Sequence, residues 1–109
     1  MKNLLFLCSR NRLRSPTAEQ VFARHPGVET ASAGLAPDAE EECSVELVER
    51  ADIIFVMEKA HRSKLQRRFG KHLKRARVIR LDIPDDYAFM QPELVALLEK
   101  KVEPHLRRL

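Results

Sequence analysis

Cysteine is scarce in this chain of 109 residues, which contains only Cys8 and Cys43. Two cysteines cannot form the framework of several disulfides that stabilises small secreted domains. No apolar run approaches the roughly 18 residues of a membrane span. The N-terminal run is broken at Cys8 and followed by charged residues, unlike a signal peptide. We therefore expect a protein of the reducing cytoplasm with no membrane partner.

Aromatic residues are also few, at 6% of the chain, although the net charge is +4 and the isoelectric point is about 9.4. Much of the basic charge lies in residues 62–77 and at Arg107 and Arg108, without interleaved aromatic rings. This pattern favours a solvated basic surface over a nucleic-acid site. Since no His, Cys and Asp residues show the spacing of metal ligands, we expect no metal and no other cofactor. Internal repeats and linkers are also lacking, so residues 1–109 are expected to form one domain.

The N-terminal segment combines a buried strand, a polar loop and the start of a helix. Residues 4–8 form an apolar run that ends at Cys8, and three arginines follow before Ser15 and Pro16. Ser15 is a favourable N-cap residue, and Pro16 at the first helical position loses no hydrogen bond. The loop N–H groups and the positive end of the helix then meet at one point, which predicts an anion-binding site.

Cys8 adds a nucleophile to the predicted anion site. Arg10, Arg12 and the helix N-terminus favour its thiolate, which is the reactive form of a cysteine. Arg14 can hold two oxygens of an oxyanion with its planar guanidinium, and Ser15 can donate its hydroxyl hydrogen to the sulfur. This combination suits in-line attack on phosphorus. The alternative is a buried, inert thiol, but core packing explains neither the arginines nor the helix start.

The motif Cys8-x5-Arg14-Ser-Pro-Thr-Ala-Glu, with Asn11 inside it and a strand before it, resembles the phosphate loop of the low-molecular-weight protein tyrosine phosphatases. The resemblance implies a short, divergent member of that family that uses Cys8 and Arg14 in catalysis. It also implies that a phosphate or sulfate ion binds to the loop residues Ser9, Arg10, Asn11, Arg12, Leu13, Arg14 and Ser15. The family usually has glycine in place of Arg10, and often a second cysteine in place of Leu13.

A second loop, residues 82–87, resembles the loop in which the family carries its general acid. The family places this acid between two prolines and before an aromatic residue, whereas here Pro84 is followed by Asp85, Asp86 and Tyr87. Asp85 is the expected acid, which protonates the leaving oxygen and later activates water. Asp86, which replaces the second proline, is the alternative acid, and Asp82 is the third candidate. Tyr87 is expected either to contact the substrate ring or to be a half-buried loop residue.

Strands and helices alternate along the chain. This order predicts an α/β fold of the Rossmann-like type: a four-stranded parallel sheet with helices on both faces and a ligand site at the carboxyl ends of its strands. The expected strands are residues 4–8, 28–33, 51–58 and 78–81. The expected helices are residues 16–24, 59–69 and 91–103. One more helix begins either at a capping box of Asp38 and Glu41 or at Ser44.

The remaining predictions concern single residues. Gly70 is expected to close the helix before it, and Pro104 to end or kink the last helix. Glu58 replaces the aspartate that is usual in the family and is assigned no catalytic role. His61 shares a helix face with apolar residues and is expected to pack in the core.

We expect, from the two loops together, a cysteine-dependent phosphatase that forms a phosphocysteine. Its substrate is a phosphorylated protein, for example one carrying phosphotyrosine, or a small phosphomonoester. The main alternative is a phosphate- or phosphopeptide-binding module with little or no turnover, because the acid loop is altered. Arsenate reductases on the same fold need further cysteines, which Cys43 alone does not supply. Cys43 is therefore expected to fill space in the core rather than to resolve an oxidised Cys8.

Overall fold

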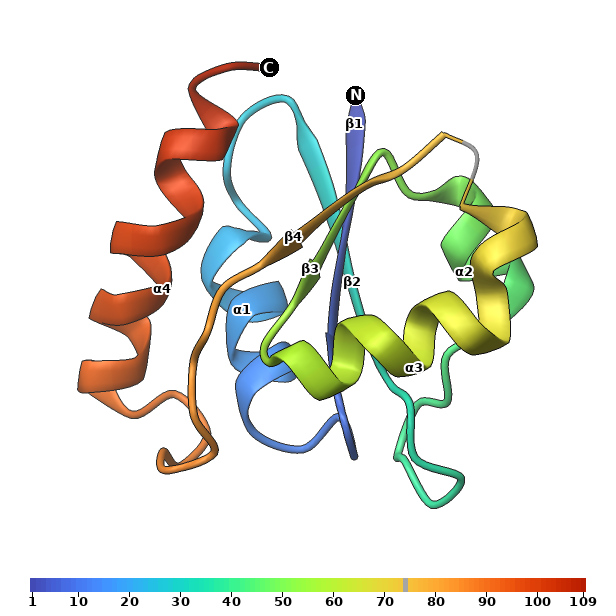
Figure 1. Ribbon diagram of the computed structural model, residues 1–109. Helices are drawn as coiled ribbons and strands as arrows, with labels where there is room; N and C mark the ends of the chain where they lie inside the picture. The colour runs from blue at the N-terminus through green and yellow to red at the C-terminus, as the bar shows by residue number, and fades with distance from the viewer. Residues whose placement is uncertain (74) are drawn as a thin grey trace.

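The computed structural model describes residues 1–73 and 75–109, and its strands form one four-stranded sheet (Figure 1). The strands are β1 (Lys2–Cys8), β2 (Val28–Gly34), β3 (Ile53–Val56) and β4 (Arg77–Arg80). They lie in the order β2-β1-β3-β4, and all three pairings are parallel. The predicted four-stranded parallel sheet is therefore confirmed.

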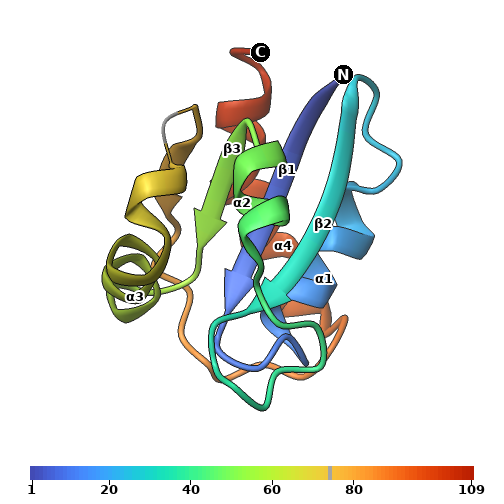
Figure 2. The same cartoon turned by 90° about the vertical axis from the view of Figure 1, so that its right-hand side faces the viewer.

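Helices cover both faces of the sheet, as predicted. The helices are α1 (Arg14–Phe22), α2 (Val45–Arg50), α3 (Lys59–Phe69) and α4 (Pro92–Leu106), with a short 3-10 turn at Gly70–His72. Figure 1 shows α1 and α4 on one side of the sheet and α2 and α3 on the other, and Figure 2 shows the same layers turned by 90°. Within the described residues, every helix is too short or too polar to cross a membrane.

The alternation of side chains along β1 builds a separate core on each face of the sheet. Leu4, Phe6 and Cys8 point to the face covered by α1 and α4, whereas Leu5 and Leu7 point to the face covered by α2 and α3. All five residues are buried, because a central parallel strand is covered from both sides. The apolar run that predicted this strand is thus explained by burial on two faces.

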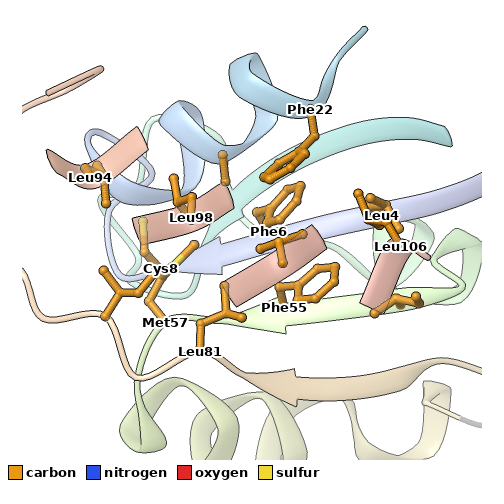
Figure 3. Close-up of a cluster of buried hydrophobic side chains, with 14 of the residues drawn as sticks. Leu4, Phe6, Cys8, Phe22, Phe55, Met57, Leu81, Leu94, Leu98 and Leu106 are labelled. Carbon is orange, nitrogen blue, oxygen red and sulfur yellow. The ribbon is translucent and has the colours of Figure 1, made fainter. Parts of the chain in front are cut away.

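An aromatic stack forms the centre of the core that contains Cys8 (Figure 3). Phe6 lies between Phe22 and Phe55, with ring centroids 5.9 and 5.1 Å away and nearly parallel planes. Leu98 of α4 is also fully buried in this cluster. Because a close-packed interior resists displacement, the stack fixes the end of β1 and therefore the position of the Cys8 backbone.

The start of α1 differs from the prediction. The helix begins at Arg14, so Ser15 lies inside its first turn and is not the N-cap residue. Leu13 occupies the cap position without a side-chain hydrogen bond to the helix. The prediction was wrong because the hydroxyl of Ser15 bonds to the preceding loop instead, where it donates to Asn11 Oδ1 at 2.9 Å.

The two alternatives for the second helix are resolved in favour of Ser44. Asp38 and Glu41 lie in an irregular segment and begin no helix. The N–H of Leu47 donates to Ser44 Oγ at 3.2 Å, which caps the first turn of α2. The acidic residues of the irregular segment are therefore free for contacts outside a helix.

The ends of α3 and α4 differ from expectation in part. Helix α3 ends at Phe69 as predicted, but Gly70 keeps a right-handed φ of −52° and starts the 3-10 turn. Pro104 does not end α4, which continues to Leu106. Leu106 is buried in the core beside the sheet, and this burial holds the last turn in place after the proline.

The carboxyl ends of the strands and the two chain termini lie at opposite ends of the molecule. In Figures 1 and 2 the loops that follow β1, β2 and β4 gather at the lower end, while both termini are at the top. Residues near the two termini, Met1 and Leu109, line one surface hollow together. The predicted ligand edge of the sheet is therefore the end where these three loops meet.

Candidate active site

The loop of residues 9–13, which joins β1 to α1, forms the floor of an open cavity of about 530 Å³. In the described part of the chain the cavity is lined by Cys8, Ser9, Arg10, Arg12, Leu13, Arg14, Ala36, Asp38 and Asp85. Cys8 is only 3% exposed, so its sulfur lies at the bottom of the cavity. Three predicted catalytic residues, Cys8, Arg14 and Asp85, are thus brought together although 77 positions separate the first from the last (85 − 8).

A chain of three polar groups supports the sulfur from behind. Cys8 Sγ lies 2.8 Å from Ser15 Oγ, and Ser15 Oγ donates to Asn11 Oδ1 at 2.9 Å. A hydroxyl has one hydrogen, so when Ser15 donates to Asn11 the hydrogen between sulfur and oxygen belongs to the Cys8 thiol. Once the thiol ionises, the Ser15 hydroxyl can rotate and donate to the sulfur. The Ser15 hydroxyl can therefore accept a hydrogen bond from the Cys8 thiol and donate one to the Cys8 thiolate.

Asn11 takes a left-handed backbone conformation, with φ of 55°, and its side chain is buried. Asparagine is one of the few residues with a side chain that adopts this conformation readily. Through this residue the loop curls back, so that Asn11 Oδ1 reaches Ser15. Asn11 and Ser15 lie beneath the cavity floor and support it, whereas Ser9, Arg10, Arg12 and Leu13 form part of its lining.

Arg14 is the first residue of α1, and its side chain is only 4% exposed. Its Nη1 donates both to Glu58 Oε2, in a very close contact, and to the carbonyl oxygen of Ile83 at 2.7 Å. Its Nε lies 3.7 Å from Asp85 Oδ1. The guanidinium therefore links the end of β3 to the loop that follows β4, and one edge of it lies beside the Asp85 carboxylate.

Glu58, to which no catalytic role was assigned from the sequence, has a structural role. It follows β3 and holds the guanidinium of Arg14 through the contact described above. An ion pair with one partner at 4% exposure is far less screened than a surface pair. Glu58 therefore fixes the orientation of Arg14 and partly offsets the cost of burying its charge.

The two candidate acids differ in position. Asp85 lines the same cavity as Cys8 and its side chain is 62% exposed, so it lies at the mouth. Asp86 is exposed, and it is not among the described residues that line the cavity. Tyr87 is half-buried and packs against the core that contains Cys8, so its ring is also outside the lining. Geometry therefore favours Asp85 over Asp86.

The segment of residues 35–43 covers one side of the loop, which no sequence pattern indicated. The N–H of Ala36 donates to the carbonyl oxygen of Ser9 at 2.8 Å, and the N–H of Glu40 donates to that of Arg10 at 3.1 Å. Exposed ion pairs join Arg10 to Asp38 and Arg12 to Glu40, both at 3.6 Å. The loop backbone is thus clamped from the side by main-chain bonds, to which the exposed pairs add little.

His61 packs in the protein as expected, but it also contacts the cavity wall. Its Nε2 lies 3.0 Å from Ser9 Oγ, and its Nδ1 accepts the N–H of Glu58 at 3.1 Å. Burial lowers the pKa of His61, and the charge of Arg14 lowers it further. The sequence could not reveal this contact, because Ser9 and His61 are 52 positions apart.

The second cysteine, Cys43, lies in a different environment from Cys8. Cys43 is buried in the core on the other face of the sheet. Burial raises the pKa of the Cys43 thiol to about 11, so the thiol stays protonated at neutral pH. This environment suits a space-filling role. Among the described residues, no cluster of three or more His, Cys, Asp or Glu side chains could hold a metal ion.

Sequence comparison matches no protein-family model, and no curated protein is similar to the chain. Solved structures do match. The structure of Vibrio vulnificus Wzb in complex with benzylphosphonate gives a TM-score of 0.79 at 22% identity and covers 99% of both chains. The YwlE arginine phosphatase from Geobacillus stearothermophilus gives 0.78 at 20% identity, over 99% of this chain and 95% of that chain.

A low-molecular-weight protein tyrosine phosphatase from T. tengcongensis gives a TM-score of 0.80 at 18% identity, with complete coverage of both chains. Identities this low establish shape rather than chemistry. The resemblance inferred from the two loops of the sequence is confirmed at that level: the chain has the fold of the low-molecular-weight protein tyrosine phosphatases.

Proposed function

We propose that the protein is a cysteine-dependent phosphatase that hydrolyses phosphomonoesters. The observation that carries this proposal is the position of the Cys8 sulfur, at the bottom of a cavity that Arg14 and Asp85 also line. A nucleophile, a buried guanidinium and a carboxyl group at the mouth are the three parts that phosphoryl transfer to a thiolate requires. The fold shared with known phosphatases supports the same assignment.

The reaction has two steps. The Cys8 thiolate attacks phosphorus and forms an S–P bond, while the P–O bond to the leaving group breaks and Asp85 gives that oxygen its proton. Water then attacks the phosphocysteine, Asp85 accepts a proton from the water, and the S–P bond breaks to release phosphate and the thiolate. Arg14 and the loop N–H groups hold the equatorial oxygens in both steps. The Ser15 hydroxyl stabilises the sulfur when it carries the charge.

We propose phosphorylated proteins or small phosphomonoesters as substrates, with aryl phosphates such as phosphotyrosine first. In support, one neighbouring structure is a complex with benzylphosphonate, whose phosphonate carries an aromatic ring. Another neighbour is an arginine phosphatase, so phosphoarginine is the competing substrate to assay in parallel. The two cysteines, neither in a disulfide, agree with the cytoplasmic location that the composition suggests.

Turnover of p-nitrophenyl phosphate tests the chemistry. Wild type should hydrolyse it, and Cys8→Ser should lose all measurable turnover because a serine hydroxyl is a far weaker nucleophile at neutral pH. The matched control is Cys43→Ser, which changes the other buried cysteine and should retain activity in the folded fraction. An inactive wild type, or a Cys8→Ser variant as active as wild type, would refute the proposal.

Substitution of the two aspartates tests the acid. With phosphotyrosine, whose leaving oxygen needs a proton, Asp85→Asn should lower kcat by about 10²- to 10⁴-fold. Asp86→Asn is the matched control at the next position and should lower kcat by about threefold at most, since Asp86 is outside the cavity lining of the described residues. Equal losses in the two variants would remove Asp85 from the mechanism.

A phosphate-binding module with little turnover is the second candidate. One observation favours it: Asp85 is 62% exposed, and its ion pair with Arg14 spans 3.7 Å, so the acid is loosely held. This candidate predicts that wild type binds inorganic phosphate in calorimetry, that Arg14→Ala abolishes binding, and that Asp85→Asn changes no rate. Tight phosphate binding without turnover of any phosphomonoester would establish it in place of the phosphatase.

A further inference from the structure

The hydrogen bonds of His61 define the state of its ring. His61 is the third residue of α3 and is 5% exposed. The backbone N–H of Glu58 can only donate, so Nδ1, 3.1 Å away, must be the acceptor. A neutral ring with Nδ1 as acceptor carries its hydrogen on Nε2. Nε2 therefore donates to Ser9 Oγ, 3.0 Å away.

This donation decides where the Ser9 hydroxyl hydrogen can go. With its oxygen occupied by the His61 N–H, Ser9 must direct its own hydrogen away from α3. Ser9 lines the cavity above Cys8, and its carbonyl oxygen is held from the other side by the N–H of Ala36 at 2.8 Å. The residue is thus fixed at both its side chain and its backbone, with one hydroxyl donor left to serve an anion in the cavity.

We propose that His61 is a positioning residue of the active site, which holds Ser9 so that its hydroxyl donates to a phosphoryl oxygen of the substrate. This proposal rests on the proposed phosphatase function and adds a donor to the loop N–H groups and Arg14. Unlike the loop N–H groups and Arg14, the Ser9 donor depends on a neutral imidazole. Protonation of His61 would add a hydrogen at Nδ1, which would then face the Glu58 N–H. His61 itself does not line the cavity in the described part of the chain.

The surroundings of His61 favour the neutral ring. Burial lowers its pKa most, and the positive charges of Arg14 and Lys64 act in the same direction. The carboxylates of Glu58 and Asp85 act in the opposite direction but do not outweigh burial. At neutral pH the ring is therefore uncharged and can make both hydrogen bonds. Acidification to the lowered pKa would abolish the bond from Glu58, because the protonated Nδ1 can no longer accept, and would remove the contact that orients Nε2 toward Ser9.

Two amide substitutions separate the bonds of His61. In His61→Gln the amide nitrogen lies close to the place of Nε2, so it can still donate to Ser9. In His61→Asn the shorter amide reaches only the place of Nδ1, so the Glu58 bond can remain while the Ser9 bond is lost. We expect His61→Asn to weaken the binding of inorganic phosphate, measured by calorimetry, by about three- to tenfold, the loss typical of one hydrogen bond. We expect His61→Gln to stay within about twofold of wild type.

Ser9→Ala shows whether His61 acts through Ser9. If it does, the double variant Ser9→Ala with His61→Asn should bind phosphate as weakly as Ser9→Ala alone, because the bond is already absent. Additive losses would mean that His61 acts by another route and would overturn the proposal. His105→Asn, which changes a histidine of α4 packed against Phe55, is the control and should leave phosphate binding unchanged.

Nuclear magnetic resonance of the imidazole nitrogens gives a readout that needs no turnover. The Nε2–H tautomer of His61, together with weaker phosphate binding in His61→Asn, supports the positioning role even if no phosphomonoester is hydrolysed; the phosphatase function alone would then fail. The Nδ1–H tautomer, or unchanged phosphate binding in His61→Asn, overturns the role of His61 while leaving a working phosphatase intact. Failure of the wild type to bind phosphate would overturn both.

Discussion

One added methyl group at Gly34 tests how tightly residues 35–43 pack on the loop above Cys8. Gly34 is the last residue of β2, and a Cβ atom there would lie 2.5 Å from the carbonyl oxygen of Ser9 and 2.5 Å from Ala39 Cβ. The carbonyl carbon of Arg10 would be 3.0 Å away. Two of these three neighbours are backbone atoms, so Gly34→Ala cannot be accommodated by turning a flexible side chain.

The loss of stability can be sized from these contacts. Overfilling a packed interior costs about 1 to 3 kcal/mol, and the Ser9 carbonyl cannot move freely because the N–H of Ala36 holds it. With about 4 to 8 °C per kcal/mol for a domain of roughly 100 residues, the Tm of Gly34→Ala should fall by roughly 4 to 24 °C. The shift of the Ser9 and Arg10 backbone should also weaken phosphate binding, since both residues line the cavity.

Thermal unfolding and calorimetric titration with phosphate measure the two effects. Gly70→Ala is the matched control, because its Cβ would meet only the end of the Gln66 side chain, at 2.8 Å, and Gln66 is exposed. Its φ of −52° suits alanine, so we expect this variant to match wild type or to gain about 0.4 to 1 kcal/mol. A Gly34→Ala variant as stable as Gly70→Ala, with normal phosphate binding, would refute the close packing described here.

Three further substitutions test individual contacts. Ser44→Ala removes the acceptor of the Leu47 N–H and should lower the free energy of unfolding by about 1 kcal/mol in urea titrations; no change would mean that the cap contributes nothing. Lys101→Met removes an ammonium that donates to the Leu81 carbonyl at 2.7 Å, just before the loop that carries Asp85. The free energy of unfolding should fall by about 1.5 kcal/mol and kcat should also fall. An unchanged kcat would mean that this contact does not help to position the Asp85 loop. Burial lowers the pKa of His105 below its usual 6.5, so the unfolded chain binds more protons than the folded chain below that pH, and stability falls with acidification. Urea titrations at pH 5 and 7 should show a smaller fall in the free energy of unfolding for His105→Phe than for wild type. Equal falls in the two proteins would contradict this.

The fold could be predicted from the sequence because its signals are local. Residues 59–69 show a helical period that ends at a glycine, and the structure has α3 over the same range. The apolar run that ends at Cys8 is typical of a strand buried on both faces, which β1 is. Alternation of such segments leaves few arrangements other than a parallel sheet covered by helices.

Details of the site depend on contacts between distant parts of the chain. Ser15 is a residue type favoured at the N-cap, but the left-handed turn at Asn11 brings an acceptor to its hydroxyl, and α1 begins two residues earlier than predicted. Glu58 contacts Arg14 across 44 positions of sequence, and no local pattern predicts such a pair. Residues 35–43 show no regular periodicity, so their position on the loop becomes visible only in the structure, through the main-chain bonds to Ser9 and Arg10 and the close approach at Gly34.

Placement of both chain ends beside each other, away from the loops that hold Cys8, has a practical consequence. An affinity tag, a fluorescent protein or a surface tether can be joined at Met1 or Leu109 without covering the cavity. Immobilised protein should therefore leave the cavity as accessible to a bulky ligand as it is in the protein free in solution. A Cys8→Ser variant attached to a resin by either end can therefore be used to test whether phosphoproteins are the substrates that we propose.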